Sequence, residues 1–104
     1  MINGIIAQGS TPTQHFPLPF DTSLIEKVSV TYSQNGKTIV TKRMEDCYFD
    51  GYCLFVRLTQ EDTLAFVPNF VVEAQAKVKL INGDVWPSDC LRFNVRIALD
   101  KEVF

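Results

Sequence analysis

The sequence KVSVTYSQNGKTIVTKRM, residues 27–44, decides the fold. In its first half, Val28, Val30 and Tyr32 alternate with polar residues, which is the period-2 pattern of a half-buried β-strand. Asn35-Gly36 follows, and the residues after it alternate again. Asn-Gly between two such runs is a strong hairpin signal, because both turn positions need a positive φ. The stretch therefore predicts a β-hairpin.

The same alternation recurs on both sides of this hairpin. Proline cannot donate to a sheet ladder, so Pro17 and Pro19 on one face predict an edge strand over residues 13–20. Further runs cover residues 46–58, 70–81 and 85–97. The residues expected to face inward in the last two runs are Val72, Ala74, Ala76, Val78, Leu80, Leu91, Phe93, Val95 and Ile97.

Turn signals separate these runs. Asn82-Gly83-Asp84 predicts a second hairpin turn, after the run over residues 70–81. Pro68-Asn69 predicts a turn before the same run. Pro87-Ser88-Asp89 predicts a bulge or bend in the last run. Thr59 stands three residues before Asp62, which is the spacing of a helix cap and predicts one short helical turn.

These elements predict an all-β fold, a single immunoglobulin-like two-sheet β-sandwich of about seven antiparallel strands. A small open β-barrel is the alternative. We expect an N-terminal arm over residues 1–12, because this segment lacks a long periodicity, the sandwich over residues 13–98, and a C-terminal tail over residues 99–104.

Charge and hydropathy limit the possible partners. The formal net charge is -2, and the lysines and arginines are spread along the chain, so a nucleic-acid partner is not expected. No apolar run approaches the roughly 18 residues of a membrane span. Met1–Ala7 lacks the basic region of a signal peptide. We expect the chain to remain in the cytoplasm that makes it, or to leave that cytoplasm within a larger particle.

The chain offers little catalytic equipment. His15 is the only histidine, and its expected place on the outward face of an edge strand is a poor one for a shielded general base. The acid pairs Glu45-Asp46 and Glu61-Asp62 fit a capping or surface role better than acid–base chemistry. We therefore expect no catalytic, metal-binding or cofactor-binding residue, no cofactor and no enzymatic activity.

The three cysteines, Cys47, Cys53 and Cys90, match neither a secreted disulfide framework nor a zinc site, and are expected to be small buried hydrophobic residues. One alternative stays open. A three-residue loop ending at Gly51 would set Cys47 directly opposite Cys53 and permit a disulfide, whereas a two-residue Asp50-Gly51 turn would break that pairing.

Aromatic residues are more numerous around Gly51 than one buried face accommodates, so part of the group should be exposed or covered by a partner. Packing at the end of the domain is the alternative. Trp86, beside a turn, suggests sugar stacking or core packing. The candidate interface residues are Tyr48, Phe49, Tyr52, Phe55 and Trp86.

Four motifs carry a resemblance that covers nearly the whole chain. They are TPTQHFPLPFDTSLI (residues 11–25), VTYSQNG (residues 30–36), LTQEDTL (residues 58–64) and ALDKEV (residues 98–103). The sequence resembles a family of small, mostly uncharacterised proteins encoded in phages and prophages of gut Firmicutes. The resemblance implies a phage-encoded protein from a structural gene neighbourhood, and it supplies no catalytic residues.

Together these observations predict a non-enzymatic phage structural or assembly protein that binds other virion components or further copies of itself, as a possible homo-oligomer. Its place would be the virion or the host bacterial cytoplasm. A small intracellular inhibitor of a host defence protein is the alternative. A carbohydrate-binding module for host attachment, using Trp86 and Tyr52, is a weaker one.

Overall fold

The structure of the chain is a computed structural model that describes residues 2–104, and its regular elements are almost all strands. The strands are β1 Gly4–Ala7, β2 Thr13–Pro17, β3 Ile25–Gln34, β4 Lys37–Arg43, β5 Cys47–Asp50, β6 Cys53–Arg57, β7 Val72–Leu80, β8 Val85–Pro87 and β9 Leu91–Arg96. The helical elements are the short helix α1, Gln60–Leu64, and the 3₁₀ turns η1, Thr22–Leu24, and η2, Met44–Asp46.

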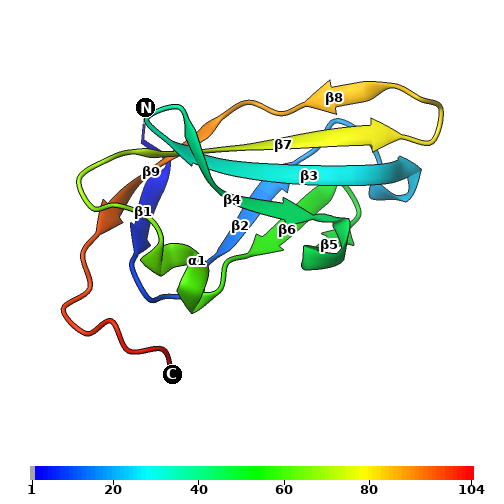
Figure 1. Cartoon of the computed structure of the whole chain (residues 1–104). Helices are drawn as coiled ribbons and strands as arrows, with labels where there is room; N and C mark the ends of the chain where they lie inside the picture. Colours follow the sequence, from blue (N-terminus) through cyan, green and yellow to red (C-terminus); the bar gives the residue numbers. More distant parts are fainter. Residues whose placement is uncertain (1) are drawn as a thin grey trace.

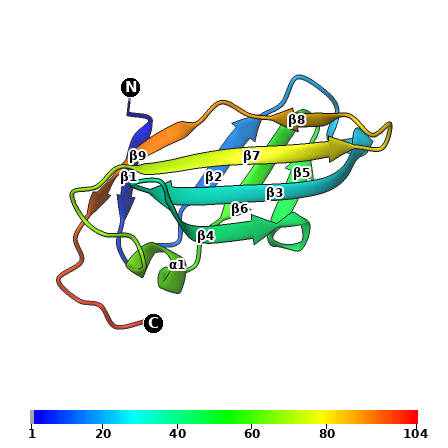
Figure 2. The same cartoon turned by 45° about the horizontal axis from the view of Figure 1, so that its top comes forward.

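The strands form two sheets that pack as two layers (Figure 1). The larger sheet has the order β1-β9-β7-β3-β4, with β8 beside β7, and the smaller sheet has the order β2-β6-β5. Figure 2 shows the strands of the smaller sheet crossing behind those of the larger one. These orders correspond to G-F-C-C′ and B-E-D of a variable-type immunoglobulin sandwich. The predicted immunoglobulin-like β-sandwich is therefore confirmed.

The predicted Asn-Gly hairpin joins β3 to β4. Asn35 has a φ of 54° and Gly36 a φ of 75°, so both residues adopt the left-handed conformation that the turn requires. The second predicted turn is also present, between β7 and β8, where Gly83 has a φ of 96°. Because Tyr32 pairs with Val40 and Val30 with Lys42, the hairpin register sets one row of side chains toward the smaller sheet.

The core lies between the two sheets and comes from the predicted alternation. The larger sheet contributes the inward residues Val28, Val30, Tyr32, Val72, Ala74, Ala76, Val78, Phe93 and Val95. Ile6 of β1 and Ile25 of β3 also belong to the larger sheet. The smaller sheet contributes Phe16, Leu54 and Val56, and the flanking segments add Leu18, Leu58 and Phe66. No disulfide links β2 to β7 as one links strands B and F of antibody domains, because the inward residues of both strands are apolar residues or Gln14.

The N-terminal segment is not the arm that its composition predicts. Strand β1 pairs in parallel with β9, so that Ile6 lies beside Val95 and is 1% exposed. Gln8 is also buried, and its side chain bonds to the carbonyl of Phe66 and to the backbone N–H of Ala98. These contacts join residues about 60 and 90 positions apart, which a local pattern of four residues cannot indicate.

The last predicted strand is divided as expected but ends earlier. Ser88 interrupts it between β8 and β9, and its hydroxyl and backbone bond to Ala76 of β7. Leu91, Phe93 and Val95 point inward as predicted. Ile97 does not, because β9 ends at Arg96 and leaves Ile97 58% exposed. The two-sheet sandwich thus has nine strands, two more than predicted.

Candidate interaction surface

The hairpin of β5 and β6 builds the candidate surface. Its turn consists of Gly51 and Tyr52, because Asp50 pairs directly with Cys53. Gly51 has a φ of 58° and Tyr52 has a negative φ, which is the pattern of a turn with glycine at its first central position. The sequence predicts either a three-residue loop ending at Gly51 or a two-residue Asp50-Gly51 turn. Neither of them is present, because the observed turn begins one residue later, at Gly51.

This register settles the question of a disulfide. Cys47 pairs with Val56 and points toward the core, whereas Cys53 lies on the outer face of the smaller sheet. The two thiols are therefore on opposite sides of the sheet, and all three cysteines are free. The expectation of buried cysteines holds only in part, because Cys47 and Cys53 are half-buried and Cys90 is exposed.

An aromatic row crosses the outer face of the smaller sheet. His15 of β2 pairs with Phe55 of β6, and Phe55 pairs with Tyr48 of β5. The rings of Phe55 and Tyr48 are stacked, with centroids 4.8 Å apart and planes 8° apart. The rings of His15 and Phe55 meet edge to face at 4.7 Å. We call these three residues the aromatic ladder.

The aromatic ladder remains accessible to a partner. His15 is exposed, Tyr48 is 57% exposed, and Phe55 lies half-buried between them. Its neighbours on the same face are Thr13 and Arg57 on one side, and Pro17, Cys53 and Asp50 on the other. An exposed aromatic strip bordered by one cation and one anion has the composition of an interface centre with a polar rim.

The five candidate interface residues do not form one surface. Tyr48 and Phe55 belong to the aromatic ladder, and Tyr52, which is 60% exposed, forms the adjoining turn. Phe49 points to the opposite side of β5 and packs against the core. Trp86 also packs against the core, and its ring meets that of Phe20 edge to face at 5.4 Å.

His15 belongs to this surface, although it is not among the five candidate interface residues predicted from the sequence. It was expected on the outward face of an edge strand, and that is its position. Its ring joins the ladder only because β2 pairs with β6 in the register that sets residue 15 opposite residue 55. The alternation of β2 predicts that His15 points outward, but it does not predict which residue of β6 lies opposite it.

The thiols of Cys47 and Cys53, in the hairpin of β5 and β6, are poor nucleophiles. Burial, reinforced by the nearby carboxylate of Asp46, raises the pKa of Cys47 to about 11. Burial, reinforced by Asp50, also raises the pKa of Cys53. A reactive cysteine needs a lowered pKa, because the thiolate is the nucleophile. Neither thiol is therefore prepared for catalysis at neutral pH.

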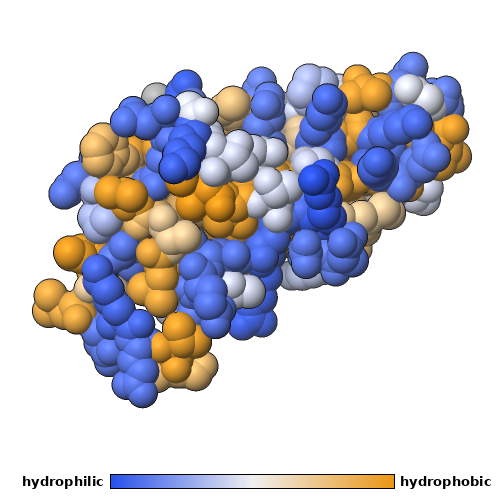
Figure 3. All heavy atoms as spheres, in the orientation of Figure 1, coloured by the Kyte–Doolittle hydropathy of each residue, from blue (hydrophilic) through white to orange (hydrophobic). Residues whose placement is uncertain are grey.

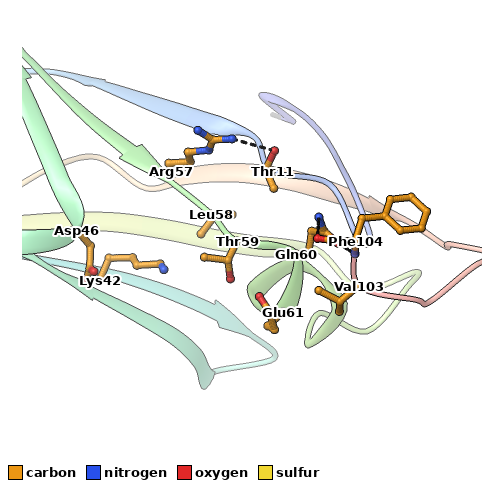
Figure 4. A pocket seen from close by; sticks show the side chains of 10 residues that line it. All are labelled: Thr11, Lys42, Asp46, Arg57, Leu58, Thr59, Gln60, Glu61, Val103 and Phe104. Atoms are coloured by element: carbon orange, nitrogen blue, oxygen red, sulfur yellow. Dashed lines mark hydrogen bonds between the residues drawn. The ribbon is translucent and has the colours of Figure 1, made fainter.

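A hollow of about 390 Å³ with both charged and apolar lining residues lies at the end of the smaller sheet near the C-terminal tail (Figure 4). Arg57 and Lys42 line it together with Asp46 and Glu61. Lys42 points toward the interior and forms an ion pair of 2.5 Å with Asp62 of α1, so its charge is already neutralised. None of the described residues that line this hollow is a histidine or a cysteine.

Residues 2–104 offer neither a metal-binding cluster nor a helix that could span a membrane. They hold no group of three or more histidine, cysteine or acidic side chains placed to bind a metal ion. None of their helices has the length and apolar character needed to cross a membrane. The exposed aromatic strip on the smaller sheet has the composition of a binding surface.

Comparison with known proteins adds one structural likeness. No protein-family model matches the chain, and no curated protein matches it. Among solved structures, the chain is similar to the V domain of amphioxus IgVJ-C2, with 11% sequence identity and a TM-score of 0.36. The likeness covers 86% of this chain and 96% of that chain. The strand order described above, and not this likeness, identifies the variable-type sandwich.

Proposed function

We propose that this domain is a non-enzymatic binding module that contacts a protein partner through the aromatic ladder, and that it serves as a structural or assembly component of a phage particle. The aromatic ladder is the observation that supports binding of a protein partner. The exposed ring of Tyr48 stacks on the half-buried ring of Phe55, on a sheet whose opposite face packs against the core. Aromatic side chains are enriched at interface centres because they bury a large area with little loss of conformational freedom.

The second part rests on the resemblance to phage and prophage proteins. Immunoglobulin-like sandwiches commonly mediate protein–protein contacts, and virions repeat such modules by symmetry. The partner is accordingly a further virion protein or another copy of this chain, in the virion or in the host bacterial cytoplasm. No reaction is proposed, because no histidine or cysteine is among the described residues that line the hollow near the C-terminal tail, and the pKa of the Cys47 thiol is raised.

A pull-down from cells that produce the phage tests the binding surface. The bait is the full chain, and the variants are Tyr48→Ser and Phe55→Thr, which remove ladder rings from a solvent-facing side of the sheet. We expect each variant to weaken capture of the partner by at least about tenfold, as loss of an interface anchor does. The control is Thr41→Ser, on the exposed outer face of the other sheet.

The identity of the captured protein tests the place in the phage. A virion component, with detection of the chain by mass spectrometry in mature or precursor particles, supports the proposal. Absence of the chain from both kinds of particle contradicts the structural role. A stoichiometric host protein would instead support an inhibitor of host defence. Undiminished capture by both ladder variants contradicts the proposed surface.

A further inference from the structure

Strand β2 has a free edge. In its antiparallel pairing with β6, Leu18 donates its N–H to the carbonyl of Tyr52, and Pro12 accepts from the N–H of Leu58. Hydrogen-bonded positions alternate along such a ladder, so the even-numbered residues of β2 face β6. The N–H and C=O groups of Thr13 and His15 consequently point to the other side. Among the described residues, no strand pairs with that side.

The place beside β2 is the position of strand A in an immunoglobulin sandwich, where the order of this sheet is A-B-E-D. In this chain a hollow of about 500 Å³ lies there, between the edges of the two sheets. Residues 3–5, the last two of which belong to β1, and residues 12–15 line it, together with Leu91 and Phe93 of the core side of β9. The hollow thus combines backbone hydrogen-bonding groups with an apolar wall, which is what an added β-strand requires.

The C-terminal tail has the complementary properties. Residues 97–104 belong to no helix or strand, and Leu99 is 99% and Phe104 90% exposed. Figure 3 shows hydrophobic surface at the end of the molecule where this tail lies. The tail touches α1 through the side chain of Gln60, which accepts from the N–H of Phe104 at 2.8 Å and donates to its carbonyl oxygen at 3.3 Å.

We propose that the tail, residues 99–104, of one copy adds as a β-strand to the free edge of β2 in a second copy. Six extended residues span about 20 Å, which matches the roughly 17 Å of the five-residue β2. Alternation sets Leu99, Lys101 and Val103 on one side of the added strand, facing the hollow, where the aliphatic stem of Lys101 lies along the apolar wall and its ammonium stays in water. Asp100, Glu102 and Phe104 then lie on the outer side, with the two carboxylates beside His15 and close to the Arg57 cation.

Such a contact joins two different surfaces of the same chain. It is therefore heterologous, and repeated copies form a ring or an open filament. This interaction goes beyond the proposed role of the aromatic ladder, because its hydrogen bonds come from the free backbone edge of β2 and not from the stacked rings of Tyr48 and Phe55. A variant at Thr13, which lies outside the ladder, separates the two proposals.

The test uses one acceptor variant and one donor variant. Thr13→Pro removes the N–H that points to the free edge and leaves the hydrogen bonds to β6 in place, as Pro17 does in the same strand. Thr13→Val is its matched control, because it keeps the N–H. The donor variant ends at Ala98 and lacks the tail. Circular dichroism and thermal melting check that each protein folds.

Sedimentation velocity over about a hundredfold range of concentration then measures association. We expect the full chain and Thr13→Val to associate, and Thr13→Pro to associate at least about fivefold more weakly, which is the effect of one lost hydrogen bond of typical strength. The two defective proteins should complement each other: a mixture of folded Thr13→Pro and the tail-less chain should form a 1:1 dimer and nothing larger.

Three results would overturn the proposal. One is a full chain that stays monomeric at every concentration. The second is association of Thr13→Pro equal to that of Thr13→Val. The third is the absence of any dimer in the mixture of the two folded defective proteins.

Discussion

The hydroxyl of Tyr32 donates a hydrogen bond to the Oε1 atom of Gln14, with 3.0 Å between the two oxygens, in the interior of the sandwich. Tyr32 is 0% and Gln14 6% exposed. Because Tyr32 belongs to β3 and Gln14 to β2, this bond joins the two sheets. It is a specific polar link between them in a domain that has no disulfide.

The first prediction concerns this link. Tyr32→Phe should lower the free energy of unfolding by about 1–2 kcal/mol, because it leaves the buried Oε1 atom of Gln14 without a donor. Gln14→Leu should cost a similar amount, since it leaves the hydroxyl of Tyr32 unpaired. The double variant should cost clearly less than the sum of the two. Urea unfolding measures all three free energies, and additive costs would contradict the link.

The second prediction concerns alkaline pH. Burial, reinforced by the charges of Cys47 and Asp62, raises the pKa of Tyr32, and burial with Asp46 raises the pKa of Cys47 to about 11. A raised pKa means that the folded state holds its proton more tightly than the unfolded state. The stability is therefore complete below the ordinary pKa of each group, 9.0 for the thiol and 10.0 for the phenol, and falls as the pH rises.

Two variants separate these contributions. Cys47→Ala should flatten the decline between about pH 9 and pH 11, the range between the ordinary and the raised thiol pKa. Tyr32→Phe should flatten the decline above pH 10. Urea unfolding at a series of pH values measures the slopes. A decline as steep in both variants as in the parent chain would assign it to other groups.

The third prediction concerns the ion pair between Lys42 and Asp62. Lys42 points inward from the edge strand β4, and its side chain is 11% exposed. Asp62→Asn should cost about 2 kcal/mol, because it leaves a nearly buried ammonium without its counter-ion. Lys42→Met should cost less, since the carboxylate of Asp62 still accepts from the backbone N–H of Thr59, and the N–H of Asp62 still donates to the Thr59 hydroxyl, in the α1 cap.

The pH dependence of this pair has the opposite sign. Burial tends to raise the pKa of Asp62, but the hydrogen bonds and charge of Lys42, with those of Thr59, outweigh it and lower the pKa. The stability that the pair contributes is therefore present above the ordinary carboxyl pKa of 3.8 and is lost as the pH falls further. Lys42→Met should make this acid decline shallower in urea unfolding; an unchanged slope would contradict the assignment.

Local patterns were sufficient for the parts of the fold that local forces determine. The turn at Asn35-Gly36 forms because both residues tolerate a positive φ, and α1 begins after Thr59 because its hydroxyl and Asp62 cap the first turn. The inward residues of β7 follow from strict alternation, since one face of the strand is buried. Such features need no knowledge of the remaining chain.

The parts that were missed depend on distant partners. Strand β1 has only four residues, and its place beside β9 comes from a parallel pairing across the length of the chain. The aromatic ladder depends on the register of three strands. The position of the Gly51-Tyr52 turn fixes the pairing of β5 with β6, which the glycine alone leaves open, and the pairing of β2 with β6 joins segments about 40 residues apart. The same register decides that Phe49 packs against the core while its neighbour Tyr48 lies on the surface.

The last prediction concerns Gln34, the final residue of β3, which holds the segment between α1 and β7. Its buried side chain accepts from the N–H of Val67 at 2.8 Å and donates to the carbonyls of Val67 and Phe70. This segment has no ladder of its own, and Asn69 within it has a φ of 71°. Gln34 thus supplies the hydrogen bonds that a paired strand would otherwise give.

Gln34→Ala should therefore lower the free energy of unfolding by about 2 kcal/mol, from several lost hydrogen bonds and unpaired backbone groups. It should also speed hydrogen exchange at the N–H of Val67 while leaving β3 and β7 protected, because the loss is local. Gln34→Glu is the matched control: it keeps the acceptor for Val67 but lacks the donor for the two carbonyls, so protection at Val67 should fall between those of the parent and the alanine variant. Equal exchange at Val67 in all three proteins would show that packing, and not this amide, fixes the segment.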